Sequence, residues 1–195
     1  QIMHYWSFPE IGLGSNGFQS PYGWLEVDFG SAYYDYSSMG DGTASTDAAA
    51  LLLYHAGVSI YMDYGYDWSG AFMNDASNSL QEHFLYLNSM YIIEDYNYYE
   101  EEFSNLLKNE LDNYRPLIYR GDPEDGSGGH AWNIDGYQDD QFHMNWGWGG
   151  QSNGYFSLNT ALGYTQYNRA IINIQPENIN EPKLFLDSYE FNETS

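Results

Sequence analysis

The sequence predicts an α+β fold in one domain, and three observations support this. Helix-like apolar spacing recurs over residues 1–113, short β-like runs follow from residue 116 to 175, and 195 residues suit a single domain. Hydrophobic residues make up 43% of the chain and aromatic residues 19%, which is too much for intrinsic disorder even at a net charge of −23. Helices followed by strands favour an α+β fold over a doubly wound one.

Four stretches carry helical signals. Ile2, Met3 and Trp6 have helical spacing in QIMHYW, and Pro9 with the glycines after it ends that helix and begins a loop that runs to about Met39. The pair Thr46-Asp47 is a typical capping start, Gly57 a typical stop, and Asp75 a further candidate cap. We therefore predict helices over residues 1–6, 47–57, 75–84 and 98–113.

Short strands separated by Gly, Asn and Asp turns dominate the rest of the chain. VSIYMDYG alternates like a strand that enters the loop GYDWSGA, and five more runs predict a meandering antiparallel sheet. Those five runs are PLIYRG, HAWNIDGYQ, QFHMNWGW, GYFSL and RAIINIQ. The predicted domain covers residues 1–176, and residues 177–195 are predicted to be a linker or the start of a following domain.

Composition argues against several classes of function. The five Lys and Arg residues form no cluster among 28 acidic residues, so nucleic acid and anionic membranes are poor partners. Without cysteine, and without a His-x-x-x-His pair, no zinc site is predicted, and the acidic loop GDPEDGSGG is read as a solvated turn rather than a calcium site. We predict no metal and no cofactor.

His130 and Asn145 are the candidate catalytic residues. His130 stands at the start of a predicted strand after two glycines, where another chain can approach closely, and a hairpin would bring Asn145 beside it. An asparagine oxygen that accepts from one imidazole nitrogen would orient the ring and leave the other nitrogen to handle a proton. The ordered set of Gly-Gly-His, then Asn-Trp-Gly-Trp-Gly-Gly, then Asn-Gly-Tyr-Phe is specific.

The motifs GGHAWNIDGYQ and HMNWGWGGQSNGYF, together with QIMHYW and DYGYDWSGA, resemble the streptopain-like bacterial cysteine peptidases, which are distant relatives of papain. The resemblance runs from Gln1 to about Pro176. It implies a papain-like fold, in which a helical part and an antiparallel sheet or barrel part meet at a cleft. It also implies a Cys-His-Asn thiol mechanism, whose second and third members map to His130 and Asn145.

Further residues acquire expected roles from this resemblance. Trp146 or Trp148 would shield the His-Asn hydrogen bond from water, and Gly129, Ser69 and Gly70 would flank the substrate backbone. The family's cysteine stands seven residues before the position of Gln1, so we expect the thiol to lie upstream of these residues and the chain by itself to be inactive. The expected partners are protein or peptide substrates and an N-terminal propeptide, with export from a bacterial cell.

Two other hypotheses remain open. A pseudo-peptidase whose gene has lost the cysteine would serve as an inhibitor or an interaction domain. A carbohydrate-binding or protein-binding module would display the Tyr, Trp and Asn residues in which this chain is rich, and its binding would not depend on His130.

Overall fold

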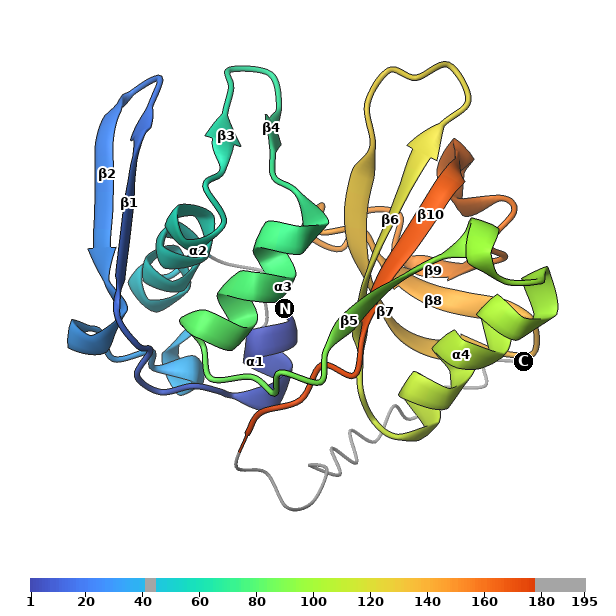
Figure 1. Cartoon of the computed structure of the whole chain (residues 1–195), viewed down its shortest axis with the longest axis horizontal. Coiled ribbons are helices and arrows are strands. Elements are labelled where there is room, and N and C mark those ends of the chain that lie inside the picture. The colour runs from blue at the N-terminus through green and yellow to red at the C-terminus, as the bar shows by residue number, and fades with distance from the viewer. Residues whose placement is uncertain (41–44, 178–195) are drawn as a thin grey trace, which may run out of the picture.

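The computed structural model describes residues 1–40 and 45–177, which form a helical half and a sheet half (Figure 1). Residues 178–195, and with them nearly all of the predicted linker, lie outside the described residues. The helical half contains α1 (Ile2–Trp6), β1 (Ser15–Ser20), β2 (Gly23–Asp28), α2 (Asp47–Ser59), β3 (Asp63–Tyr64), β4 (Ser69–Gly70) and α3 (Met73–Glu82). The sheet half contains β5 (Tyr91–Glu94), α4 (Glu100–Asp112), β6 (Leu117–Pro123), β7 (His130–Gln138), β8 (Gln141–Asn145), β9 (Gly154–Phe156) and β10 (Tyr164–Ile172). Short 3-10 helices occupy Phe29–Ser31, Tyr36–Ser38, Asp95–Asn97 and Ala161–Gly163.

The helical half largely follows the predicted signals. The three apolar residues of α1 are buried as their spacing predicts, and the Thr46 hydroxyl accepts a hydrogen bond from the Ala49 N–H at 3.1 Å, which caps α2. Gly57 does not end α2, because the helix continues to Ser59. A Cβ at Gly57 would meet the Tyr64 hydroxyl, so close packing explains this glycine better than a helix stop does. Helix α3 begins at Met73, which makes Asp75 a first-turn residue and not the cap.

Two of the predicted loop and strand assignments in this half are corrected by the structure. Residues 9–39 are not a simple loop, because β1 and β2 form an antiparallel hairpin in which Ser15 pairs with Asp28 and Ser20 with Gly23. The predicted strand at 58–65 shrinks to Asp63–Tyr64, since Val58 and Ser59 complete the last turn of α2.

The sheet half is one six-stranded antiparallel sheet in the order β5-β10-β6-β7-β8-β9. Strands β6 to β9 form the predicted meander, whereas β5, which precedes α4 in the chain, was not predicted and forms one edge. Helix α4 packs Phe103 and Leu107 against Leu117, Tyr119 and Trp132 in the core of this half. This order of elements confirms the predicted α+β class.

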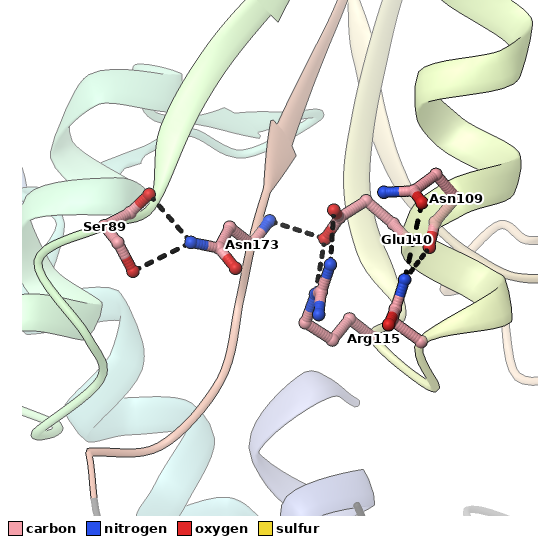
Figure 2. A network of polar contacts seen from close by, with 6 residues as sticks. Ser89, Asn109, Glu110, Arg115 and Asn173 are labelled. Carbon is pink, nitrogen blue, oxygen red and sulfur yellow. Dashed lines mark hydrogen bonds and ion pairs between the residues drawn. The ribbon is translucent and has the colours of Figure 1, made fainter.

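Strand β10 ties the two halves together. Successive side chains point to opposite faces of a strand, and here Ala170 and Ile172 belong to the core of the sheet half while Ile171 joins the core of the helical half. After the strand, the Asn173 N–H donates to the Glu110 carboxylate at 2.7 Å, and its side-chain amide donates to the carbonyl and hydroxyl of Ser89 (Figure 2). Glu110 is buried and also accepts two bonds from Arg115, so α4, β10 and the segment after α3 are held in one polar network.

Two hairpins, one from each half, lie on the same side of the molecule. The β3–β4 hairpin and the β6–β7 hairpin both rise at the top of Figure 1, and Gln1 lies between and below them. Helix α1 runs downward from Gln1, away from both hairpins (Figure 1). None of the helices in the described residues has the length and hydropathy needed to span a bilayer.

Candidate active site

His130 is the first residue of β7 and lies among aromatic rings. It pairs with Gly121 of β6, and its imidazole stacks on Trp148 with ring centroids 4.9 Å apart and planes inclined by 29°. The rings of Trp132 and Trp146 lie 6.0 and 6.1 Å from it, also stacked, and Tyr164 lies at 5.6 Å. The imidazole is therefore fixed in orientation by packing on several sides.

One hydrogen bond sets the tautomer of this ring. The His130 Nε2 lies 3.0 Å from the backbone carbonyl oxygen of Trp146. A carbonyl oxygen only accepts, so Nε2 carries the proton and donates it. In the neutral ring, Nδ1 is then the basic nitrogen and is left to exchange a proton with a reacting group.

The structure differs here from the predicted bond between His130 and Asn145. Within the described residues, the side-chain oxygen of Asn145 instead accepts from Gln1 Nε2 at 2.8 Å and from the Gly147 N–H at 3.3 Å. Asn145 pairs with Asn133, and residues 130 and 133 of one strand point to opposite faces, so Asn145 and His130 do not share a face. Continued past the strand end, the same register places Trp148 opposite His130, in agreement with their stacking.

Asn145 nevertheless lies one residue from the carbonyl that His130 uses. Its bond to the Gly147 N–H closes a turn around Trp146, and the Trp146 N–H donates to the Asn153 side chain at 3.1 Å. The N–H groups of Trp146 and Gly147 are thus both hydrogen-bonded, and the Trp146 carbonyl that lies between them is held in place. Asn153 was not predicted as a site residue, although it stands in the quoted motif just before Gly154.

The two tryptophans take different places around the ring. Trp146 is buried, with 1% of its surface exposed, and provides the carbonyl, whereas Trp148 is 41% exposed and covers the ring from the solvent side. Trp148 is the better candidate for excluding water, a choice that the sequence left open.

Gly129 is packed against an ion pair. Arg120 Nη2 lies 2.7 Å from Asp122 Oδ1, and a Cβ at Gly129 would fall 2.0 Å from that oxygen and 2.6 Å from that nitrogen. Any side chain at 129 would have to displace this pair. Beside it, Arg120, Asp122, Glu124 and Tyr167 help to line a depression of about 620 Å³ next to the loop that leads to His130.

Ser69 and Gly70 form β4, which lies on the other hairpin. They pair with Tyr64 and Asp63, and Ser69 is exposed. Among the described residues, no hydrogen bond or ring contact joins them to His130, so the structure brings together His130, Trp146, Trp148 and Gly129 and leaves Ser69 and Gly70 across from them on the helical half.

Gln1 is a contact that the sequence did not predict. Its side-chain amide donates to Asn145 and its oxygen accepts from Asn133. These bonds anchor the first turn of α1 to strands β7 and β8. A site for Gln1 between Asn133 and Asn145 follows from the pairing register, which places the two asparagines opposite each other, and not from local sequence patterns.

The other histidines serve elsewhere. His143 Nδ1 lies 2.5 Å from Asp135 Oδ1, and this hydrogen bond raises the His143 pKa above its usual value. His55 is buried against the Tyr34 hydroxyl, and burial lowers its pKa. In the part of the chain that the structure describes, no three His, Asp or Glu side chains gather as metal ligands would.

Comparison with known proteins gives the family. The model of the peptidase C10 family matches residues 1–156, which include α1, His130 and Asn145. The chain belongs to the peptidase C10 family. A solved structure of this fold, active wild-type interpain A cysteine protease from Prevotella intermedia, superimposes with a TM-score of 0.77 at 31% identity and covers 89% of this chain and 78% of its own.

Further relatives of this C10 chain include two curated proteins. Thiol protease/hemagglutinin PrtT of Porphyromonas gingivalis is 29% identical over 96% of this chain, and streptopain of Streptococcus pyogenes is 32% identical over 66% of it. The chain spans only 24% of PrtT and 35% of streptopain. A prointerpain A fragment from Prevotella intermedia also matches, with a TM-score of 0.74 at 31% identity over 88% of this chain and 59% of its own. These matches agree with the predicted papain-like architecture.

Proposed function

We propose that this C10 chain belongs to the catalytic domain of a cysteine endopeptidase that hydrolyses protein substrates. The observation that carries the proposal is the state of His130: its Nε2–H is bound to the Trp146 carbonyl, its ring packs against those of Trp146 and Trp148, and Nδ1 remains the basic nitrogen. Such a ring is suited to exchange a proton with a thiol.

The resemblance to streptopain-like peptidases implies a cysteine seven residues before the position of Gln1, and we propose that it supplies the thiol, since the 195 residues contain none. The side chain of Gln1 bonds Asn145 and Asn133, so the first turn of α1 already lies against the strands that carry the site. A helix continued backward by seven residues would extend about 10 Å from there. A thiol near the start of such a helix is stabilised as thiolate by the free N–H groups and by an adjacent imidazolium.

The reaction follows from these groups. The thiolate attacks the carbonyl carbon of the scissile peptide bond, and the C–N bond breaks as His130 Nδ1–H gives its proton to the leaving amine. The thioester that remains is attacked by water, whose proton passes to Nδ1. The acid product leaves, and the thiolate and imidazolium are restored.

The neighbouring residues are proposed to position this pair. Asn145 acts through the turn at Trp146 and Gly147 and not by touching the ring, and Trp148 limits the access of water to the imidazole. Gly129, against which the Arg120–Asp122 pair packs, would flank the substrate backbone beside His130. The free edge of β4, with Ser69 and Gly70, would pair with the substrate backbone.

Export and an N-terminal propeptide are also part of the proposal. They are supported by the family and by the likeness to a prointerpain A fragment. Mass spectrometry of culture medium and cells would show a shorter form outside the cell and a longer precursor, whereas a full-length product found only inside the cell would contradict export.

An activity assay of the complete natural protein tests the proposal. An internally quenched peptide should be hydrolysed, and both iodoacetamide treatment and His130→Ala should abolish hydrolysis. The control His143→Asn, a histidine on the neighbouring strand that has its own partner in Asp135, should retain the rate. Hydrolysis that survives both treatments would overturn the thiol mechanism, and a protein with no thiol and no hydrolysis would be a pseudo-peptidase.

A further inference from the structure

A second cavity lies at the far end of α1 from Gln1. It encloses about 590 Å³, a size typical of small-ligand sites, and is formed by residues of α1 and of the segment 33–37 together with Ser7 and Glu10. Helix α1 has five residues and is therefore about 7.5 Å long. Helix α1 runs downward from Gln1, away from the two hairpins (Figure 1), and the cavity is lined by the last residues of α1 and not by its start.

The walls of this cavity are held by bonds between its segments. The Tyr34 N–H donates to the Glu10 carbonyl at 2.8 Å, and Ile11 and Tyr33 form an isolated β-bridge. The Tyr36 hydroxyl donates to the Pro9 carbonyl at 2.9 Å. The cavity is therefore largely formed before any ligand arrives.

Aromatic rings and carboxylates dominate the lining. The rings are those of His4, Tyr5, Tyr33, Tyr34 and Tyr36. Glu10 and Asp35 supply two carboxylates, and the described residues that line the cavity include no Lys or Arg. Tyr33 is 58% exposed, which makes its ring the most accessible platform.

The charges of Asp35, Tyr34 and Tyr36 are fixed near neutral pH. Hydrogen bonds from the Ser37 and Ser38 hydroxyls, each 2.6 Å long, lower the pKa of Asp35, so this carboxylate stays ionised. Burial raises the pKa of Tyr34 and of Tyr36, so their rings stay neutral. Neutral tyrosine faces beside carboxylates attract cations, because the ring quadrupole is negative at its face.

We propose that this cavity, which we call the tyrosine cavity, binds an organic cation, either an alkylammonium or a guanidinium group. Its two carboxylates supply the charge, and the accessible ring of Tyr33 supplies a face against which the cation packs, while Tyr34 and Tyr36 are buried and form the wall behind it. A neutral sugar would also stack on tyrosine and donate hydroxyl hydrogen bonds to the carboxylates, but it lacks the positive charge that two carboxylates attract. This site lies apart from His130, so the inference stands or falls separately from the proposed peptidase activity.

Calorimetric titration of the complete natural protein tests the inference. The probes are N-acetyl-arginine amide and choline, each with a neutral counterpart of the same shape, N-acetylcitrulline amide and 3,3-dimethylbutanol, and a neutral disaccharide. The first pair represents a protein side chain and the second a small quaternary amine, so the stronger of the two cations identifies the source. We expect a cation to bind with a Kd of about 1 mM or below, and its neutral counterpart to bind at least about tenfold more weakly.

Variants separate the cavity from general attraction to an acidic protein. Tyr33→Leu and Glu10→Gln should each weaken cation binding by about threefold to tenfold. The controls Tyr22→Leu and Glu82→Gln change an exposed tyrosine and an exposed glutamate outside the cavity and should leave binding unchanged. Because Glu10 is exposed, Glu10→Gln serves as the second variant if Tyr33→Leu unfolds.

Three results would overturn the inference. They are equal binding of cation and neutral counterpart, equal weakening by the cavity variants and the controls, and binding of the disaccharide alone. The second of these would show only that cations collect on a chain with a net charge of −23.

Discussion

The imidazole of His130 is held by the backbone of Trp146, whose carbonyl oxygen lies 3.0 Å from Nε2. A backbone acceptor cannot be removed by substitution, so the orientation of the ring depends on whatever fixes the turn at Trp146. Asn145 and Asn153 fix that turn through bonds to the N–H groups of Gly147 and Trp146. We therefore expect Asn145 to affect catalysis indirectly, through the orientation of the His130 ring.

Substitution of Asn145 tests whether its loss lowers the catalytic rate less than the loss of His130 does. We expect Asn145→Ala to lower kcat/KM of the complete protein by about 10- to 100-fold, because the turn loosens and the ring shifts. His130→Ala should cost far more, on the order of the millionfold loss seen when a catalytic group is deleted. Steady-state kinetics on both variants decide the matter, and equal losses would mean that the Asn145 side chain is itself the partner of the ring.

Gly129→Ala tests whether the close packing of Gly129 against the Arg120–Asp122 pair is needed for activity. The added Cβ would lie 2.0 Å from Asp122 Oδ1, so either the ion pair or the mouth of β7 must move. We expect kcat/KM to fall by at least about tenfold, since small displacements near the reacting groups are costly.

Gly136→Ala provides the matched control on the same strand. A Cβ there would come no closer than 3.7 Å to the His143 side chain, which is ordinary contact. Its kinetics should stay close to those of the parent protein. A Gly129→Ala enzyme with unchanged kcat/KM would show that the ion pair moves aside without effect.

The network around Glu110 should dominate the coupling between the two halves. Glu110→Ala leaves Arg115 and the Asn173 N–H without their shared acceptor, and we expect a loss of about 3 kcal/mol in the free energy of unfolding. Urea denaturation measures this loss. Asp140→Ala removes the partner of Lys108 at a side chain that is 99% exposed and should cost under about 1 kcal/mol. Similar losses for the two variants would contradict the role of the Glu110 network.

His143 should make stability depend on pH above about 6.5, the usual histidine pKa. The hydrogen bond to Asp135 raises the His143 pKa in the folded state, so the folded protein binds more protons than the unfolded one above that value. Its contribution is then fully present below about pH 6.5 and is lost as the pH rises through the raised pKa. Thermal denaturation across pH 6 to 9 should show a smaller decline in His143→Asn, and an unchanged decline would refute this assignment.

His55 should act in the opposite direction. Burial lowers its pKa, so the unfolded chain takes up a proton first as the pH falls below about 6.5, and the folded state is destabilised. We expect His55→Gln to be less stable near neutral pH, because the bond to Tyr34 changes, but to lose less on acidification. Urea denaturation at pH 7 and pH 5 provides the comparison, and equal losses in the two proteins would count against it.

Much of the fold could be predicted from the sequence. Strand β7 has the predicted bounds, and α4 begins and ends within two residues of the prediction, because alternation and helical spacing are strong in both. The β1–β2 hairpin was missed even though Pro21 and Tyr22 mark its turn, since β1 has one large apolar residue, Phe18, and an apolar Trp24 lies on the exposed face of β2. The prediction that α2 ends at Gly57 was wrong, because a glycine that packs against Tyr64 cannot be distinguished from a helix stop without knowledge of tertiary contacts.

The candidate site was predicted in part. His130, Trp146, Trp148 and Gly129 do lie together, but the bond partner of His130 was assigned to the wrong group. The alternation along β7 already placed His130 and Asn133 on opposite faces, and only the register, which pairs Asn133 with Asn145, shows the consequence. Register depends on turn length and on the bulge near Ile134, which local patterns do not define.

The most direct test of the central claim, that His130 serves a thiol located before α1, is the rate at which the complete natural protein reacts with iodoacetamide at pH 6. We expect a single cysteine seven residues before Gln1 to react rapidly, and His130→Ala to slow the reaction by at least about tenfold, because an adjacent imidazolium keeps the thiol ionised. Alkylation at the same rate in both proteins, or the absence of a thiol at that position, would contradict the account.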